Sequence, residues 1–308
     1  MGFQNGFRIN TNTSAVNTYR SYSTAQAGLE RNIERLSSGL RINRAADDAA
    51  GLAISQRMNN QVRGMQQANR NVQQGNNLLQ TAEGAMNEIG NILGRMRELA
   101  VQSASDTMGS SDRTSIDNEF NSLGEEITRI ASSTKYNGLT LLDGSYNETD
   151  EAAKTLTIQI GSNNSANDKL SLNFGDFSLS GNTDFGGTAA DLGTGVHDVD
   201  VAAAVTADEF DLTSGANAQA TITTLDSMIG AVNDARSDVG AKQNRLEFTA
   251  SNLMNSIQNN AASMSTIRDA DFAAEAADLA KNQILVQSGT SMLAQANGLS
   301  QNVLALIR

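Results

Sequence analysis

Hydrophobic residues recur along residues 58–100 at alternating spacings of four and three. They are Met58, Val62, Met65, Val72, Leu79, Ala82, Met86, Ile89, Leu93, Met96 and Ala100, and Asn69 and Asn76 fill two further steps. A spacing of about 3.5 residues puts one stripe along one side of a helix and favours packing along a partner helix. At about 1.5 Å per residue, the stretch predicts a helix of roughly 65 Å. Asn at such core positions fixes register at a cost in stability.

The same spacing predicts a helix before this stretch. Its stripe is Ala15, Tyr19, Tyr22, Gln26, Leu29, Ile33, Leu36 and Leu40. Asn12, Thr13 and Ser14 offer an N-cap, because their side-chain oxygens can accept from free backbone N–H groups. Residues 37–39 (Ser-Ser-Gly) should loosen the end of this helix, and Asp47 or Asp48 should cap the long helix that follows.

A third helix is predicted after the Gly- and Ser-rich break at residues 106–111. Its stripe is Ile116, Phe120, Leu123, Ile127 and Ile130, with Ser111 or Asp112 as the cap. The short connection favours an antiparallel return along the long helix. Turn signals at residues 137–138 (Asn-Gly) and 143–144 (Asp-Gly) then enclose the apolar run 139–142.

From residue 156 the period changes to two. Leu156, Ile158 and Ile160 alternate with polar residues, as do Leu170, Leu172 and Phe174, which predicts a β-hairpin. Residues 175–220 show weak periodicity and predict loops and short strands.

Helical spacing returns at residue 225 and continues to the end of the chain. The first stretch, from Leu225 to Ile257, carries Lys242 on its stripe, so the seam is imperfect there. The last stretch, from about Asp271, carries two adjacent stripes, which make a face too wide for one partner helix. The first stripe is Leu285, Gly289, Met292, Ala296, Leu299, Val303 and Leu306, and the second is Leu279, Val286 and Leu293. Such a face predicts burial against other copies or partners.

Composition narrows the class of protein. The 308 residues include no Cys, no Pro and no Trp, and the net charge is −12. Absence of Pro fits long helices, and absence of Cys excludes disulfides and thiolate chemistry. Residues 143–222 hold 13 acidic and two basic residues, which predicts a solvated outer surface and argues against nucleic-acid binding. No apolar run of about 18 residues predicts a membrane span, and no ordinary signal peptide is expected.

The sequence offers little for catalysis or metal binding. His197 is the only histidine. Asp198 and Asp200 lie near it in the sequence, but one His with two Asp in a polar stretch usually belongs to the protein surface rather than to a metal site. Without a base beside a nucleophile or a phosphate-binding loop, we expect no enzyme activity, no metal site and no cofactor.

Several motifs resemble bacterial flagellins. Residues Ile33–Asn43 and Ala46–Ile54 resemble the N-terminal region of that family, and Arg95–Ser103 resembles a motif on its long helix. Thr290–Asn297 and Gln301–Leu304 resemble its C-terminus. The resemblance covers roughly residues 8–175 and 220–308.

The resemblance implies a fold and a division of the chain. The expected fold is mainly α: a long antiparallel helical rod or coiled coil with paired terminal helices, a β-hairpin and a small loop- or β-rich central segment. Residues 1–45 and 270–308 would form a terminal coiled-coil domain in the filament core. Residues 46–175 and 220–269 would form the helical rod, and 176–219 a variable outer segment.

The resemblance also implies a function and partners. The chain would be exported by the flagellar type III apparatus and would self-assemble outside the cell. Its partners would include an export chaperone and the cap protein. We expect the assembly contacts on the terminal helices, at Leu29, Ile33, Leu36, Leu285, Met292, Leu299, Val303 and Leu306. Flagellins are recognised by a Toll-like receptor, and the family's contact residues are matched by Arg95, Leu99, Gln102 and Glu119. Gly94 stands where related sequences often carry Gln.

Two other functions stay open at this point. A hook–filament junction protein shares similar terminal helices, although the length of the matched rod favours a flagellin. A soluble extracellular adhesin or immune ligand is the alternative from another class.

Overall fold

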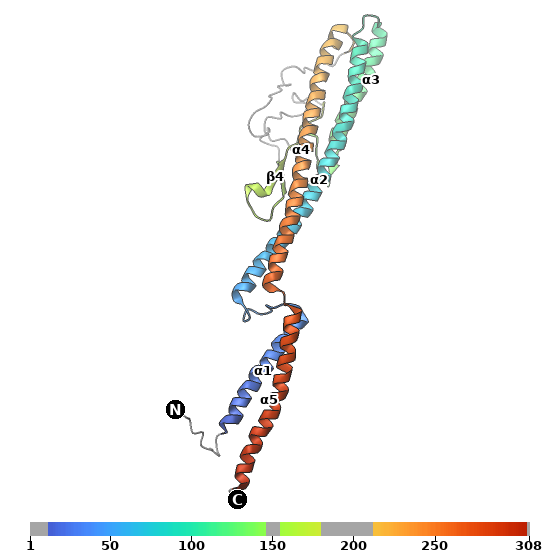
Figure 1. Ribbon diagram of the computed structural model, residues 1–308. Helices are drawn as coiled ribbons and strands as arrows, with labels where there is room; N and C mark the ends of the chain where they lie inside the picture. The colour runs from blue at the N-terminus through green and yellow to red at the C-terminus, as the bar shows by residue number, and fades with distance from the viewer. Residues whose placement is uncertain (1–11, 146–154, 180–211, 307–308) are drawn as a thin grey trace. The chain divides into compact units, whose positions relative to one another are not determined.

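The computed structural model describes residues 12–145, 155–179 and 212–306 (Figure 1). Long α-helices make up most of these residues, which confirms the mainly α fold. The helices are α1 (Thr13–Ser38), α2 (Ala49–Ser103), α3 (Ser110–Ser133), α4 (Gly215–Arg268) and α5 (Phe272–Leu306). The strands are β1 (Lys135–Tyr136), β2 (Leu139–Thr140), β3 (Leu156–Gln159) and β4 (Lys169–Leu172), with the short 3₁₀ turn η1 (Ala166–Asp168) between the last two.

The ends of α1 follow the sequence signals. The Asn12 side chain accepts from the backbone N–H of Ala15 at 3.0 Å, as an N-cap does. Gly39 ends the helix in the left-handed region at φ 72°, where residues other than Gly are strained. Asp48 then caps α2 by accepting from the N–H of Gly51 at 2.8 Å. The predicted breaks between these two helices are therefore confirmed.

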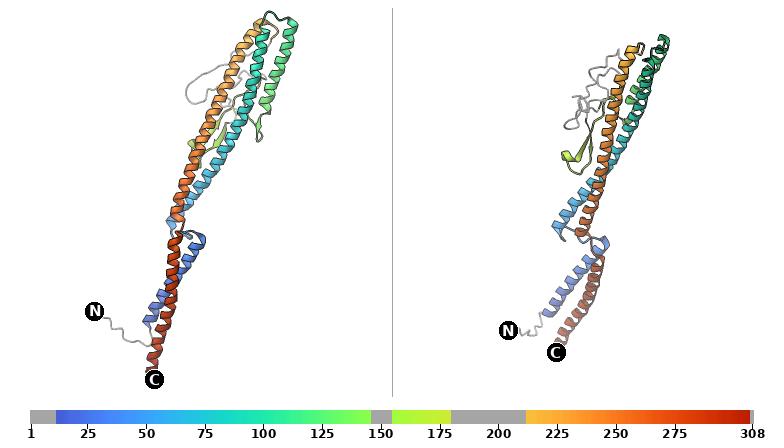
Figure 2. Two further views of the ribbon diagram at one scale, coloured as in Figure 1. Left: turned by 45° about the vertical axis from the view of Figure 1, so that its right-hand side comes forward. Right: turned by 45° about the horizontal axis from the view of Figure 1, so that its top comes forward.

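The chain forms two compact units, and each is described by itself. The first comprises residues Met1–Val62 and Gln258–Arg308. Within it, α1 and α5 lie side by side and antiparallel, as the views of Figure 2 agree. The segments that follow α1 and α4 are tied by backbone hydrogen bonds: Arg41 N–H donates to Arg268 O at 2.7 Å, and Ala270 N–H donates to Gly39 O at 3.0 Å.

The second unit, residues Arg63–Ile257, is a helical bundle with two small β-hairpins. The α2 stripe predicted from spacing forms its core: the side chains from Met65 to Ala100 on that stripe are buried, apart from the half-buried Asn69 and Asn76. Glu83 accepts from Gln243, and Arg97 pairs with Asp226, so α2 and α4 run antiparallel. Figure 1 shows α3 returning alongside α2. Phe120 and Ile127 of α3 are fully buried in this unit.

Two antiparallel hairpins complete the described structure. β1 pairs with β2 across a two-residue turn in which Asn137 and Gly138 both have positive φ, at 50° and 84°. Only a few residue types accept that geometry, and Asn-Gly is the favoured pair. β3 pairs with β4, with Ile158 opposite Leu170, which confirms the hairpin expected from the period of two.

One helix cap was predicted wrongly. We expected Ser111 or Asp112 to cap α3, but the helix begins at Ser110, and its N-cap is Gly109 without a side-chain hydrogen bond. Asp112 lies in the first turn instead. A carboxylate there still interacts favourably with the helix dipole, so the acidic residue contributes without acting as the cap.

The expected domain boundaries near residues 45 and 270 stay a prediction. Most of the central segment predicted at residues 176–219 lies outside the described residues. None of the helices that the structure describes is long and apolar enough to span a membrane.

Candidate functional site

The seam between α1 and α5 is narrow and largely polar. Ala25 and Asn32 are the buried residues of α1. In the orientation that satisfies both of its ends, the Asn32 amide donates to Gly28 O at 2.8 Å and accepts from Leu279 N–H at 3.0 Å. Arg35 pairs with Glu275 at 3.0 Å. Few apolar side chains are therefore removed from water when these two helices pair.

Glycines and polar ends bring the two helices close together. A Cβ added at Gly28 would lie 2.9 Å from Nδ2 of Asn282, and one at Gly289 would lie 3.3 Å from Tyr22. At the far end of the pair, the Asn12 side chain donates to Ala296 O at 2.9 Å. Asn12 thus caps its own helix and also ties it to α5.

The seam includes the second α5 stripe and the two small residues of the first stripe, Gly289 and Ala296. Leu279, Val286 and Leu293 are half-buried, together with Gly289 and Ala296. Leu285 and Met292, from the first stripe, are 47% and 57% exposed. No described side chain of α5, residues 272–298, is buried. In the described part of the structure, the two large side chains of the first stripe are therefore left exposed beside the seam.

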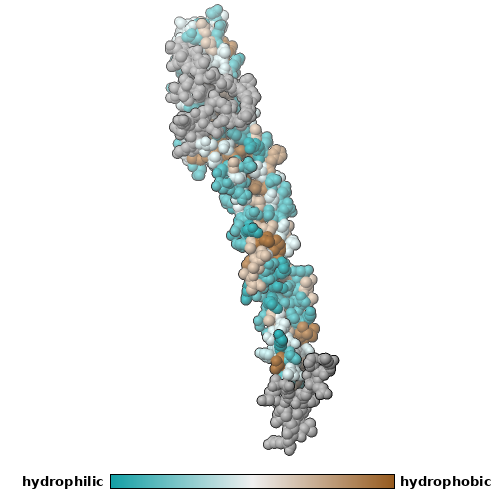
Figure 3. All heavy atoms as spheres, turned by 90° about the vertical axis from the view of Figure 1, so that its left-hand side faces the viewer, coloured by the Kyte–Doolittle hydropathy of each residue, from teal (hydrophilic) through white to brown (hydrophobic). Residues whose placement is uncertain are grey.

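The predicted assembly residues fall into three groups. Leu29 and Leu36 are half-buried beside the seam. Ile33, Leu285 and Met292 are exposed. Leu299, Val303 and Leu306 lie in α5, but their side chains lie outside the described part of the structure. Figure 3 shows apolar side chains at the surface in several separate places among polar ones.

Arg95 of α2 and Glu119 of α3 form the second candidate site. The Arg95 guanidinium contacts the Glu119 carboxylate at 2.9 Å and that of Glu98 at 3.0 Å. The hydrogen bond to Glu119, and then that to Glu98, raises the pKa of Arg95. The three side chains are 49–71% exposed. The cluster is therefore a solvated group of charges that joins two helices.

The other two residues matched by the resemblance lie differently. Leu99 is 2% exposed, so it belongs to the core. Gln102 is exposed two turns after Arg95. The structure thus brings Arg95 and Glu119 together and leaves Gln102 on the surface, while Leu99 is buried.

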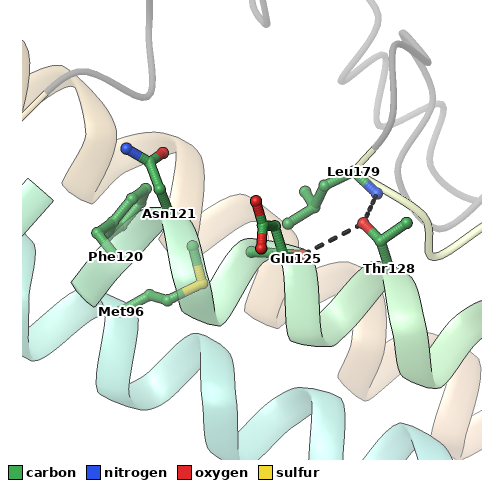
Figure 4. A pocket seen from close by; sticks show the side chains of 7 residues that line it. Met96, Phe120, Asn121, Glu125, Thr128 and Leu179 are labelled. Atoms are coloured by element: carbon green, nitrogen blue, oxygen red, sulfur yellow. Dashed lines mark hydrogen bonds between the residues drawn. The ribbon is translucent and has the colours of Figure 1, made fainter. Parts of the chain in front are cut away.

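A shallow hollow of about 390 Å³ lies on α3 in the same unit (Figure 4). Phe120, Asn121, Glu125 and Thr128 of α3 line it, with Met96 and Leu179. The Thr128 hydroxyl accepts from Leu179 N–H at 3.2 Å and donates to Gly124 O at 3.2 Å. This contact anchors the segment after β4 on α3, and the hollow contains no group of catalytic side chains.

Sequence reasoning missed the polar seam residues. Asn32, Arg35 and Glu275 were not singled out, although opposite charges on two predicted helices are a usable signal. Among the described residues, no group of three acidic or histidine side chains could hold a metal ion. His197, with Asp198 and Asp200, lies outside the described residues.

Comparison with known proteins identifies the family to which this architecture belongs. Residues 9–147 match the family described as Bacterial flagellin N-terminal helical region, and residues 222–307 match Bacterial flagellin C-terminal helical region. The chain is 44% identical to Flagellin of Bacillus subtilis (strain 168) over 98% of this chain and 100% of that one. The chain belongs to the bacterial flagellin family.

Of two further comparisons, the first agrees with this family. The Flagellar filament 33 kDa core protein of Treponema phagedenis is 41% identical over 97% of this chain and 99% of that one. A solved structure assigned as a flagellar hook-associated protein of Vibrio parahaemolyticus is 15% identical, with a TM-score of 0.53 over 72% of this chain and 100% of that one. The second likeness concerns the fold alone.

The two flagellin family matches leave residues 148–221 between them. The first match ends before β3, so the hairpin lies outside it, although we expected the resemblance to extend to about residue 175. Bacterial flagellins are structural proteins, and the flagellar filament lies outside the cell.

Proposed function

We propose that this chain is a structural subunit that self-assembles with other copies into a bacterial flagellar filament. Family membership supports this, as does the relative named a filament core protein. The observation that carries the proposal is the apolar surface that the described part of α5 leaves exposed. Leu285 and Met292 are about half exposed on a helix that has no buried side chain among those described.

The composition of the C-terminal part of α5 keeps the free-energy cost of burying it low. Residues 282–307 contain no charged side chain. Burying a charge costs several kcal/mol unless it is paired, whereas apolar side chains gain about 25 cal/mol per Å². Because the α1–α5 seam is narrow, additional stabilisation must come from contacts with other chains. A tube built from one kind of chain needs heterologous interfaces, in which different patches meet.

Replacement of exposed stripe residues tests this function. The variant Leu285→Ser with Met292→Ser should keep its circular dichroism spectrum but fail to form filaments in electron micrographs. The matched control is Leu285→Met, which keeps an apolar side chain of similar volume and should assemble. A persistently monomeric unmodified protein, or normal filaments from the Ser variant, would contradict the proposal. A soluble adhesin would also remain monomeric.

We further propose that a Toll-like receptor recognises the exposed Arg95 cluster of the unassembled subunit. The supporting observation is that Arg95, Glu98 and Glu119 are exposed and held together by ion pairs. Exposed Arg is enriched among residues that dominate protein interfaces. An export chaperone, the cap protein and passage through the type III apparatus belong to the same proposal and are implied by the family resemblance.

A receptor-reporter assay tests the role of Arg95. Arg95→Ala should reduce the response to soluble protein at least tenfold. The matched control is Arg129→Ala, which removes another exposed Arg paired with Glu126 on α3. An equal response from both variants and the unmodified protein would exclude the Arg95 cluster as the recognised surface.

A further inference from the structure

Methionines are unevenly exposed in this chain. The structure describes nine of the ten, of which Met65, Met86, Met96 and Met228 are buried and Met58, Met108 and Met264 are half-buried. Met254 of α4 is 61% exposed, and Met292 of α5 is 57% exposed. These two thioethers are the described ones most open to a dissolved oxidant.

Met292 is one of two large side chains of the first α5 stripe that are about half exposed in the described structure. It follows the exposed Leu285 by seven residues, which puts both on the same side of α5. The contacts with α1 fall on other α5 residues, such as Asn282 and Gly289. Met292 therefore lies at the exposed edge of the α1–α5 seam, on the surface that the proposed assembly would bury.

Met254 differs from Met292 in its surroundings. The α4 residues one turn before and after it include the exposed polar Ser251 and Gln258. A change in polarity at Met254 therefore falls on a surface that already carries exposed polar side chains. The two methionines have nearly equal exposure, so they form a natural matched pair.

We infer that Met292 is a site of reversible oxidation by peroxides, and that its sulfoxide opposes self-assembly. This inference rests on the proposed function. In the reaction, the Met292 sulfur attacks one oxygen of hydrogen peroxide, an S–O bond forms and the O–O bond breaks. The sulfur is oxidised by two electrons, and the other oxygen leaves as water with both peroxide protons.

The sulfoxide changes what the α5 stripe can bury. It replaces an apolar, adaptable thioether by a polar group that requires a hydrogen-bond partner when it is removed from water. Leu285, its neighbour on the stripe, offers none. A subunit oxidised before assembly would thus join the polymer less favourably, whereas an assembled subunit would have its sulfur covered.

The experiment measures assembly after controlled oxidation of the full chain. Monomers are treated with hydrogen peroxide, and the sulfoxide at each methionine is quantified by peptide mass spectrometry. We expect the critical concentration for polymerisation to rise about tenfold, equivalent to about 1.4 kcal/mol per subunit. Methionine sulfoxide reductases of both epimer specificities should restore the original value.

Two variants locate the effect. The critical concentration of Met292→Leu, compared with its own untreated value, should not rise on peroxide treatment, whereas that of Met254→Leu should rise as in the unmodified chain. An unchanged critical concentration after full oxidation of Met292, or protection by Met254→Leu alone, would overturn the inference. Failure of the untreated, unmodified chain to polymerise would instead contradict the proposed function.

Discussion

Lys242 shows how a single polar residue is accommodated in the core. It occupies a stripe position of α4 between the buried Val239 and Leu246 and is itself only 7% exposed. Its ammonium lies 2.7 Å from the Asp238 carboxylate, one turn earlier on the same helix. A buried ion pair rarely adds net stability, but loss of one partner leaves an uncompensated charge.

Removing one partner of this pair should therefore cost more than removing both. Asp238→Ala should lower the free energy of unfolding by about 3 kcal/mol, the lower end for a buried pair, because Asp238 retains some solvent contact. Asp238→Ala combined with Lys242→Met should recover most of that loss. Urea unfolding followed by circular dichroism measures both, and a single variant as stable as the double one would contradict this account.

The ion pair between Arg97 and Asp226 predicts a pH dependence. The hydrogen bond from Arg97 lowers the pKa of Asp226, whereas an unfolded Asp titrates at about 3.9. A lowered folded-state pKa contributes stability that is fully present above the unfolded pKa and is lost as pH falls through the folded one. As the pH falls below about 4, the denaturant midpoint of unfolding should therefore decrease more steeply for the unmodified chain than for Asp226→Asn. Parallel curves for the two proteins would exclude a contribution from this pair.

At the scale of elements, α2 serves as the surface on which the β3–β4 hairpin packs. Asn71 of α2 donates to Gln159 O of β3 at 3.1 Å. A Cβ at Gly75 would overlap the Ile158 side chain, and one at Gly64 would lie 3.0 Å from Ser162. Glycine is unfavourable in a helix interior by about 1 kcal/mol relative to Ala. These two glycines therefore lower the stability of α2 as a helix but allow the hairpin to approach it closely.

Substitutions of glycine along α2 should separate these two effects. Gly84 has no neighbour that a Cβ would meet, so Gly84→Ala should stabilise the fold by up to about 1 kcal/mol. Gly75→Ala should gain less or destabilise, because Ile158 must leave its preferred rotamer at a cost of about 0.5–1.5 kcal/mol. Ile158→Val removes the overlapping methyl group and should restore the gain. Equal stabilisation by both Ala variants in thermal unfolding would contradict the close-packing explanation.

At the scale of the whole molecule, packing is satisfied very differently in the two compact units. Residues Arg63–Ile257 bury a continuous apolar stripe within one chain. The pair α1–α5 buries only Ala25 and Asn32 of α1. Helices in proteins gain most of their stability from tertiary packing. The second unit should therefore fold alone, while the terminal helices should gain order from neighbouring copies.

Truncation of α5 tests this difference. Removal of residues 290–308 should abolish polymerisation, because it deletes Met292 and the uncharged helix end. The circular dichroism and urea unfolding of the remaining chain should still report a cooperative helical unit. Filaments from the truncated chain, or a loss of cooperative unfolding, would each contradict the separation of roles.

Much of the fold could be predicted because it depends on local chemistry. The spacing of three and four along α2 identified its core residues, and Asn137-Gly138 identified a turn whose positive φ angles few other pairs accept. The alternation around Ile158 identified β3. The α3 cap was missed because Ser110, Ser111 and Asp112 are equivalent candidates in sequence, and only the path of the preceding loop selects Gly109.

The sequence by itself determined where helices form and that α5 carries more apolar surface than one partner can cover. Only the tertiary structure decided which residues of its two stripes face α1. The two stripes are adjacent and both apolar, so periodicity cannot rank their residues. The choice depends on where Gly28 and Gly289 permit close approach and where Asn32 and Arg35 find partners. Those contacts join residues about 240 or more positions apart, and they leave Leu285 and Met292 exposed.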